Sequence, residues 1–174
     1  DRNPQLHDLY RIDVATGDRE LVLQNPGYAG FTLDDNYRVR FASRFEADGS
    51  LSYFEVAEDG AIGAEPYMSV PQGDALTTGI AGFDADGDTM YLFDSRLGDT
   101  AALFAKNIET GETDLVFEHP KADVSGIMSH PTTNAIEAVS ANYLRTEWTV
   151  LDETVAGDLK YLASIENGEV NVTS

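Results

Sequence analysis

The amino-acid sequence predicts an all-β fold, namely part of a β-propeller built from four-stranded antiparallel sheets, or blades. Two internal repeats support this prediction. Residues 9–26 recur as residues 103–120 at an offset of 94, and each copy has an apolar-rich strand, a Thr-Gly turn, a second strand and a proline. Residues 31–44 align with residues 83–96 at an offset of 52. Hairpins that repeat at such intervals are typical of propellers, because one blade cannot bury both faces of its sheet alone.

The first predicted element is a β-hairpin that turns at Thr16-Gly17, a residue pair suited to a tight turn. The apolar residues of its two strands are Leu9, Ile12, Val14, Leu21 and Leu23.

A strand is predicted over residues 37–44, after a turn at Asp34-Asp35-Asn36. Apolar and basic residues alternate there, which places successive side chains on opposite faces of a strand. The predicted faces are Tyr37, Val39 and Phe41 on one side, and Arg38, Arg40 and Arg44 on the other.

The remaining elements continue this β pattern until residue 151. Strands are expected at residues 51–56, 66–70, 80–83, 90–93, 101–108, 115–117, 135–143 and 147–151, with another that starts at Val124. Residues 152–163 instead predict a short helix with Asp152 as its N-cap. The residues that share one face of this helix are Leu151, Val155, Leu159 and Leu162. Residues 169–172 are predicted to form one more strand.

These elements predict one partial propeller domain with about three to three and a half blades. Residues 1–27 would end one blade, residues 28–75 and 76–122 would form two blades, and residues 123–174 would form a blade with the helical insertion. Closed propellers have about four to eight blades, so an open arc would expose unpaired strand edges. We therefore expect a fragment of a larger polypeptide, or a chain that a partner completes.

Charge composition excludes two classes of partner. The chain of 174 residues carries 31 acidic against 11 basic residues, a net charge of −20. Such a surface repels phosphate backbones and anionic lipids, so neither nucleic acid nor membrane is an expected partner. Because the acidic residues are spread along the chain, we interpret them as a solvated surface, with attraction of cationic ligands as the alternative.

The sequence contains no cysteine, which excludes disulfides, thiolate nucleophiles and cysteine-based metal sites. This composition fits the bacterial cytoplasm and the periplasm equally. A run of about 18 apolar residues, the length that spans a membrane as a helix, does not occur.

No catalytic residue is predicted. A serine hydrolase of the α/β type needs Gly-x-Ser-x-Gly at a strand-to-helix turn, and the nearest match, Val124-Ser125-Gly126, lacks the first glycine. We interpret His7, His119 and His130 as turn or loop residues and not as general bases, since two of them directly precede proline. No cofactor is expected, because there is no Gly-rich phosphate loop.

No metal site is predicted either. The histidines lack the i, i+4 spacing of a helical zinc site. The segment Asp84–Asp88 resembles the start of a calcium loop, but Thr89 and Ser95 occupy the positions that require glycine and glutamate. We interpret it as a hairpin turn, like the Asp-Gly pairs at residues 48–49 and 59–60.

Arg44 and Arg96 are the candidate binding residues. Each follows a serine and ends one of the two aligned strands of the second repeat. Because repeated positions of a propeller lie on one ring, both guanidinium groups could face a central substrate channel and bind a carboxylate or a peptide terminus. The alternative is an ion pair with the abundant acidic residues, at the surface or between blades.

Several segments together carry a family resemblance. They are residues 3–17, residues 82–87, residues 94–103, Ala122-Asp-Val124, His130-Pro-Thr-Thr133 and Arg145-x-x-Trp148. In this order they resemble the N-terminal propeller of bacterial prolyl oligopeptidase-family serine peptidases. The resemblance covers essentially the whole chain. Its Asp-Gly strand turns are shared with many TolB-like propellers.

The resemblance implies a role in proteolysis without catalysis. In that family the propeller lies over an α/β-hydrolase domain and admits peptides while it excludes folded proteins. The catalytic serine, aspartate and histidine belong to the C-terminal hydrolase domain, so none of them carries over to this chain. The implied partners are peptide substrates of the parent enzyme, and the missing blades and C-terminal hydrolase domain of the same polypeptide.

A second hypothesis belongs to another class of protein. The chain could be a stand-alone TolB-like binding module that self-association completes, which predicts a stable dimer of half-rings. A third hypothesis, a metal-dependent lactonase, ranks last because such an enzyme needs ligands around a full ring and the chain has no histidine cluster.

Overall fold

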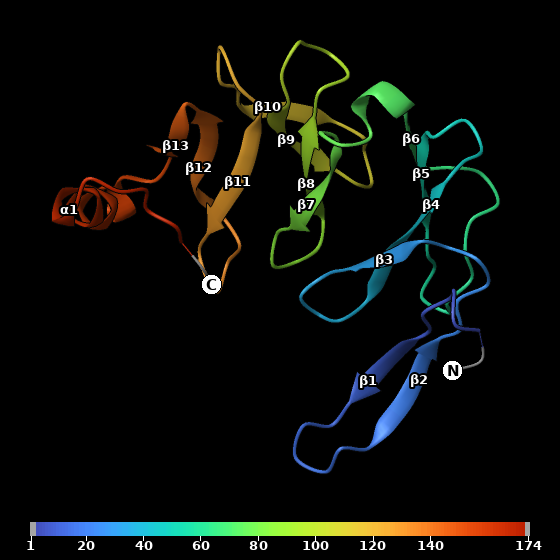
Figure 1. Ribbon diagram of the computed structural model, residues 1–174. Helices are drawn as coiled ribbons and strands as arrows, with labels where there is room; N and C mark the ends of the chain where they lie inside the picture. The colour runs from blue at the N-terminus through green and yellow to red at the C-terminus, as the bar shows by residue number, and fades with distance from the viewer. Residues whose placement is uncertain (1–2, 173–174) are drawn as a thin grey trace. The chain divides into compact units, whose positions relative to one another are not determined.

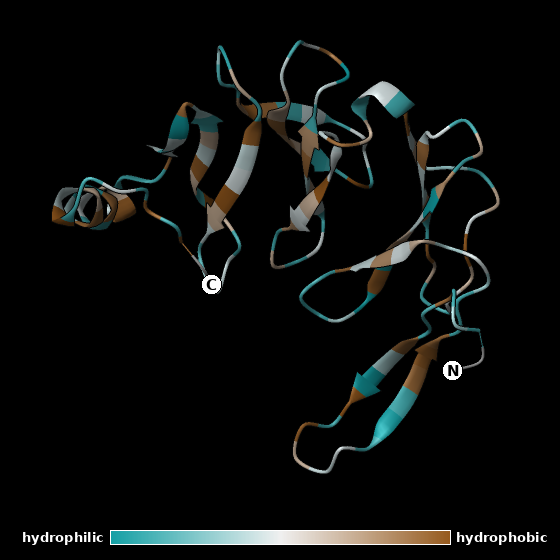
Figure 2. Cartoon of the chain, viewed as in Figure 1, coloured by the Kyte–Doolittle hydropathy of each residue, from teal (hydrophilic) through white to brown (hydrophobic). Residues whose placement is uncertain are grey.

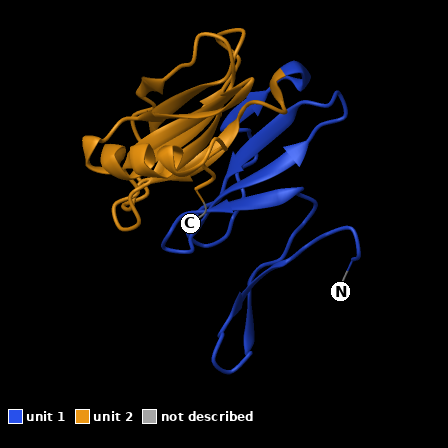
Figure 3. Cartoon of the chain, turned by 60° about the vertical axis from the view of Figure 1, so that its left-hand side comes forward, with its two compact units in different colours: residues 1–73 blue, residues 74–174 orange. Residues whose placement is uncertain are grey.

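The structure is a computed structural model that describes residues 3–172, and it confirms the all-β fold (Figure 1). All of its sheets are antiparallel, and strands that follow one another in sequence pair with each other, which is the strand order of propeller blades. The chain divides into two compact units, residues 1–73 and residues 74–174, coloured separately in Figure 3. Each unit contains its own sheets and its own apolar cluster.

The first unit contains a two-stranded and a four-stranded sheet. Strands β1 (Leu9–Ile12) and β2 (Arg19–Leu23) form the predicted hairpin, and Gly17 in its turn has φ +77°, a conformation that favours glycine. The larger sheet has the order β3-β4-β5-β6. These strands run over Gly30–Leu33, Val39–Phe45, Leu51–Glu55 and Met68–Val70. A 3-10 turn, η1 (Gln72–Asp74), follows in the sequence.

The second unit contains a four-stranded and a three-stranded sheet. The first has the order β7-β8-β9-β10, with bounds Gly79–Phe83, Thr89–Asp94, Ala102–Asn107 and Thr113–Phe117. The second has the order β11-β12-β13, with bounds Val124–Ser129, Ile136–Tyr143 and Arg145–Val150. Asp123 joins the two sheets, because its carboxylate accepts a 2.7 Å hydrogen bond from the backbone N–H of Ala101.

The inner strands are the most buried parts of these sheets. Four consecutive residues of β5, Leu51–Phe54, are buried, and five consecutive residues of β12, Glu137–Ala141, are buried as well. The outer strands β2 and β10 are mostly exposed. Figure 2 shows apolar residues concentrated in the strands and hydrophilic residues in the loops. Continuous burial along a strand means that both faces of that strand are covered.

The β1–β2 hairpin is attached to the four-stranded sheet of its unit by apolar packing at its base. Leu9 and Leu23 pack against a buried cluster that contains Val39, Ala42 and Val56.

A buried asparagine reinforces this attachment. The side chain of Asn25 donates to the carbonyl groups of His7 (3.2 Å) and Tyr28 (2.8 Å), and accepts from the backbone N–H groups of Gly27 (2.9 Å) and Tyr28 (2.7 Å). The backbone N–H of Asn25 donates to the carboxylate of Asp8 at 2.8 Å. Asn25 is only 2% exposed, so these bonds replace water for every polar group of its side chain.

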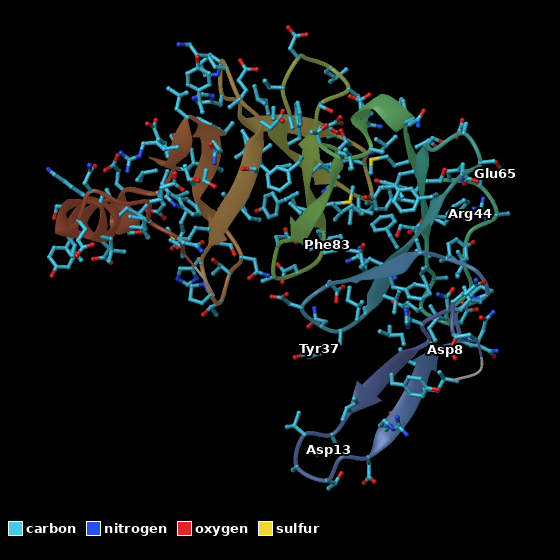
Figure 4. All side chains as sticks on the ribbon, in the orientation of Figure 1. Asp8, Asp13, Tyr37, Arg44, Glu65 and Phe83 are labelled. Carbon is cyan, nitrogen blue, oxygen red and sulfur yellow. The ribbon has the colours of Figure 1, made fainter. Side chains whose placement is uncertain are left out.

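The predicted strand over residues 37–44 begins too early. Tyr37 has φ +59° and is 80% exposed, so it belongs to the turn before β4 and not to the apolar face of the strand (Figure 4). The turn is held by Asp34, whose carboxylate accepts from the backbone N–H groups of Asn36 and Arg38, both at 3.0 Å.

The predicted strict alternation is also wrong beyond this turn. The register changes from Leu33↔Val39 to Thr32↔Phe41, which leaves Arg40 as an extra, bulged residue on β4. A bulge interrupts the two-residue side-chain period, and Val39 accordingly packs in one buried cluster with Ala42 and not with Phe41. Arg40 pairs with the buried carboxylate of Asp34 at 3.1 Å instead of pointing into solvent.

The predicted helix near residues 152–163 is present. A 3-10 turn, η2 (Glu153–Val155), leads into α1 (Ala156–Ile165), and Leu159 is its buried residue. Asp152 caps the 3-10 turn, because its carboxylate accepts from the Thr154 backbone N–H at 2.9 Å, and the hydrogen bonds from Thr154 lower the pKa of Asp152. Residues 169–172, predicted as a strand, have no regular structure. Within residues 3–172, no helix has both the length and the hydrophobicity needed to cross a membrane.

Replacing Asn25 with alanine is expected to lower the free energy of unfolding by about 2–3 kcal/mol, because several buried backbone groups lose their partners. Chemical denaturation monitored by fluorescence would measure this change. Gln24→Ala, at an exposed neighbouring position, is the control and is expected to change stability by less than about 0.5 kcal/mol. Equal effects of the two substitutions would contradict the anchoring role of Asn25.

Candidate functional site

Arg96 lies two residues beyond the end of β8 and forms a two-pronged ion pair with Asp94. Its Nε donates to Asp94 Oδ1 at 2.9 Å and its Nη2 donates to Asp94 Oδ2 at 2.5 Å. The backbone N–H of Arg96 also donates to Asp94 Oδ1, at 3.0 Å. Such parallel bonds fix the plane of the guanidinium group as well as its position.

Burial and charge have opposite effects on the pKa of Asp94, whose side chain is 8% exposed. Burial alone would raise this pKa, but the hydrogen bonds and the positive charge of Arg96 outweigh burial, so the pKa of Asp94 lies below its ordinary value. The hydrogen bond to Asp94 in turn raises the pKa of Arg96, against a smaller opposing effect of burial. The pair therefore remains ionised at neutral pH.

A network of short polar side chains lies beside this ion pair. Ser95 Oγ donates to Asp74 Oδ1 at 2.8 Å and lies 2.7 Å from Thr77 Oγ1 and 3.1 Å from Thr78 Oγ1. The backbone N–H of Ser95 donates to Thr78 Oγ1 at 2.9 Å. A nucleophilic serine needs a general base such as histidine, and Ser95 is bonded to a carboxylate and hydroxyls. The network therefore joins the start of β7 to the end of β8, and it contains no serine–histidine pair.

Sequence reasoning missed this network, because its partners lie 17 to 21 residues apart. One signal was available. The short polar residues of Thr77-Thr78 directly precede β7, and Ser95 directly follows β8, the strand that pairs with β7.

The histidines His119 and His130 have local structural roles. His119 Nδ1 accepts from the backbone N–H of Lys121 at 3.3 Å, and His130 Nδ1 accepts from the backbone N–H groups of Thr132 and Thr133, both at 3.2 Å. These bonds confirm the interpretation of the two histidines as turn residues.

Arg44 has a different environment on β4, where it lies opposite Ser52 of β5 (Figure 4). Its Nε and Nη2 donate to one oxygen of Glu46 at 3.1 and 3.0 Å. Its guanidinium carbon also lies 4.6 Å from the ring centroid of Phe54 and 5.7 Å from that of Tyr28. A guanidinium group over aromatic rings gains cation–π attraction in addition to its ion pair.

The two candidate arginines do not occupy the same position along their strands. Arg44 lies within β4, whereas Arg96 lies after Asp94, the last residue of β8. They belong to different compact units, and each has its own acidic partner two residues away. These ion pairs fit the alternative interpretation made from the sequence, and the role of both residues in a substrate channel stays a prediction.

The acidic turn at Asp84–Asp88 is a hairpin turn. Asp84 Oδ1 accepts from the backbone N–H groups of Asp88 at 2.9 Å and Thr89 at 3.1 Å, and Gly87 has φ +77°. Across the described residues 3–172, no three histidine, cysteine, aspartate or glutamate side chains gather in a way that could hold a metal ion.

A pocket of about 540 Å³ lies between β13 and α1 in the second unit. Its lining includes Arg145, Glu147, Trp148, Leu159, Lys160 and Glu166. Trp148 Nε1 donates to the Val170 carbonyl at 2.9 Å, and Arg145 Nη2 donates to the Gly168 carbonyl at 2.6 Å. These bonds hold the segment after α1 along the outer edge of β13. The pocket contains charges of both signs, which by themselves favour no particular reaction.

Comparison with known proteins relates this chain to peptidases. It is 41% identical over 176 aligned residues to dipeptidyl aminopeptidase BIII of Pseudoxanthomonas mexicana, and 29% identical over 182 residues to dipeptidyl peptidase family member 6 of Caenorhabditis elegans. In both cases the alignment covers all of this chain and 25% of the relative. No family model matches the chain, and no solved structure matches it.

The chain therefore spans about a quarter of the length of the curated peptidases that it matches. The chain, whose structure is mostly β-strands, is similar to about a quarter of each of these peptidases. The ion-pair partners of the two candidate arginines are Glu46 for Arg44 and Asp94 for Arg96.

The Asp94–Arg96 pair is expected to make a pH-dependent contribution to stability. Arg96→Ala should lower the free energy of unfolding by about 1–2 kcal/mol at pH 7, because a largely buried carboxylate loses its partner. The pKa of Asp94 is lowered in the folded state, so this contribution is complete above the ordinary aspartate pKa of about 3.9 and is lost as the pH falls through the lower, folded value.

Denaturation of wild type and variant between pH 3 and pH 8 would measure the difference. Arg11→Ala is the matched control, because Arg11 and Glu20 are both 73% exposed and 3.8 Å apart, and it is expected to change stability by less than about 0.5 kcal/mol. A difference between wild type and Arg96→Ala that grows as the pH falls would contradict the assigned pairing.

Proposed function

We propose that this chain is a non-catalytic propeller segment of a prolyl oligopeptidase-like serine peptidase. In this role it shapes and limits the access of peptides to an active site in a hydrolase domain of the same polypeptide. The observation that supports the proposal best is the 41% identity, over the whole chain, to a quarter of a dipeptidyl aminopeptidase.

The structure supports a scaffold role in two ways. Its four-stranded sheets have the up-and-down order of propeller blades. The buried Ser95, the serine nearest to a carboxylate in the polar network, is bonded to Asp74 and two threonines and has no imidazole partner there. Both observations agree with a segment that positions substrate without reacting with it.

Arg44 and Arg96 are the residues proposed to meet the substrate. Each guanidinium group is held in place by one acidic residue, Glu46 or Asp94. A carboxylate at a peptide terminus would bind the same planar group through two parallel hydrogen bonds. The chain is strongly acidic, with a net charge of −20. A fixed guanidinium group would therefore attract the carboxylate of such a terminus, which the surrounding acidic residues repel.

The chain alone is expected to release no chromophore from dipeptidyl p-nitroanilide substrates above the rate in buffer. The reason is that Ser95, the serine of the polar network, is bonded to Asp74 and two threonines and not to a histidine. Absorbance assays with and without a serine-directed phosphonate would check this. Turnover that the phosphonate abolishes would contradict the proposal.

A chimera tests the positive part of the proposal. In the Pseudoxanthomonas mexicana peptidase, the aligned quarter is replaced by residues 1–174 of this chain, and the chimera is expected to retain kcat/KM for a dipeptidyl substrate within about tenfold. Arg44→Ala and Arg96→Ala in this chimera should raise KM for peptides with a free C-terminal carboxylate by about three- to tenfold and leave kcat unchanged.

Arg11→Ala in the same chimera is the control for a general charge effect, and the amidated peptide is the control for the carboxylate. A purely structural role of the two arginines would change kcat and KM for both peptides equally. A folded chimera without peptidase activity would contradict the proposed equivalence of the segments.

A further inference from the structure

The two hairpins that repeat in the sequence also have the same strand register. In the β1–β2 hairpin the pairs are Leu9↔Leu23, Tyr10↔Leu21, Arg11↔Glu20 and Ile12↔Arg19. In the β9–β10 hairpin they are Leu103↔Phe117, Phe104↔Leu115, Ala105↔Asp114 and Lys106↔Thr113. Every pair of the first set becomes a pair of the second when 94 is added, and both hairpins contain the same irregularity beside the first pair.

The turns agree as closely as the strands. Gly17 donates to the Asp13 carbonyl at 2.7 Å, and Gly111 donates to the Asn107 carbonyl at 2.9 Å. The two glycines have φ +77° and +74°. The two hairpins are therefore equivalent units of structure.

Their surroundings differ along one edge. Strand β9 is an inner strand that pairs with β10 on one edge and with β8 on the other, through Leu92↔Phe104 and neighbouring pairs. Strand β5 of the other four-stranded sheet is likewise paired on both edges. Strand β1 belongs to a two-stranded sheet, so among residues 3–172 its sheet partner is β2 alone. The edge of β1 that corresponds to the β8-facing edge of β9 is open.

An apolar groove follows this open edge. It has a volume of about 460 Å³, and its lining is Leu9, Tyr10, Arg11, Ile12, Val14, Val22, Leu33 and Tyr37. Ile12 is 56% exposed, although it belongs to an apolar strand. An exposed cluster of large apolar side chains beside an unpaired strand edge is the kind of surface that another strand covers.

Val14 marks the difference between the two hairpins most clearly. It is 98% exposed. Its equivalent, Ile108, is only partly exposed, and the backbone N–H of Ile108 donates to the Asp88 carbonyl in the β7–β8 turn at 3.0 Å. The β7–β8 hairpin thus reaches the position of Ile108, and an equivalent hairpin beside β1 would reach Val14.

We propose that the open edge of β1 and its groove bind a β-hairpin of the β7–β8 kind, supplied by a segment that precedes β1 in a longer form of this polypeptide. The strand next to β1 would run antiparallel to it and carry apolar residues in the places of Met90 and Leu92. This inference rests on the internal repeat and its register, and it does not depend on the peptidase role.

Two observations favour this source over a second copy of the chain. In the equivalent copy, the β7–β8 hairpin directly precedes β9 and is joined to it by seven residues, 95–101. The relatives are also about four times as long as this chain, which allows for such a segment. A second copy would bring a further net charge of −20 to the interface, which opposes association.

A fusion protein tests the proposal. A copy of residues 77–94 is placed directly before Asp1 of the full chain, so that residues 1–7 connect it to Asp8, the equivalent of Ala102. This connector has the same length as residues 95–101. Hydrogen exchange of the backbone amides is then compared between the chain and the fusion, with the Ile108 amide as the internal reference.

The Val14 amide is expected to exchange fast in the chain alone and at least about tenfold more slowly in the fusion, approaching Ile108. A control fusion in which the copied hairpin carries Asp at the positions of Met90 and Leu92 should give no protection.

Two results would overturn the proposal: unchanged Val14 exchange in the first fusion, or a dimer of the unfused chain, seen by sedimentation velocity, in which Val14 is already protected. Val14→Asp, a substitution at an exposed position, should leave the unfused chain folded and remove the protection in the fusion.

Discussion

The structure depends on one constraint, which is that an inner strand of an apolar antiparallel sheet needs a partner at both edges and cover on both faces. β5 shows this constraint most clearly. Its residues Leu51–Phe54 are all buried, and it pairs with β4 and β6. A strand of this kind leaves no side for water, so it is stable only within a stack of sheets. The repeats in the sequence are the consequence, because each sheet must resemble the next in order to cover it.

The local signals predicted the elements well, because they depend on neighbours in the sequence. Thr16-Gly17 and Thr110-Gly111 lie in the turns of their hairpins, with glycines that have positive φ, and Asp152 caps the turn before α1. The error at Tyr37 has a specific cause. The polar run Asp34-Asp35-Asn36 predicted a turn, but the turn extends through Tyr37 because the Asp34 carboxylate also binds the backbone N–H of Arg38. An aromatic residue with positive φ is uncommon, so the pattern favoured a strand there.

The candidate site was harder to predict, because its geometry depends on strand register and on contacts between distant residues. The internal sequence alignment placed Arg44 and Arg96 at matching positions. Because of the bulge at Arg40 and the different strand ends, the two residues occupy different positions relative to their own strands. A shift of one residue changes the face on which a side chain lies. The surroundings of each guanidinium also differ: Phe54 and Glu46 contact Arg44, whereas Asp94 holds Arg96. Composition indicated that acidic partners were abundant, but only the fold determines which of them pair.

The same constraint connects the scaffold role to the open edge of β1. A segment that positions substrates must hold its side chains rigidly, and rigidity requires complete sheets. In the β9–β10 hairpin, where β8 pairs with β9, Leu103 is fully buried in a cluster with Val124 and Val139, whereas the equivalent Leu9 is partly exposed. The base of the β1–β2 hairpin is nevertheless anchored by Asn25 and by the packing of Leu9 and Leu23. The hairpin is therefore preformed in register before any further strand binds, so the addition of a strand has to order only the incoming segment. A binding edge organised in this way loses less conformational entropy on binding than a disordered one.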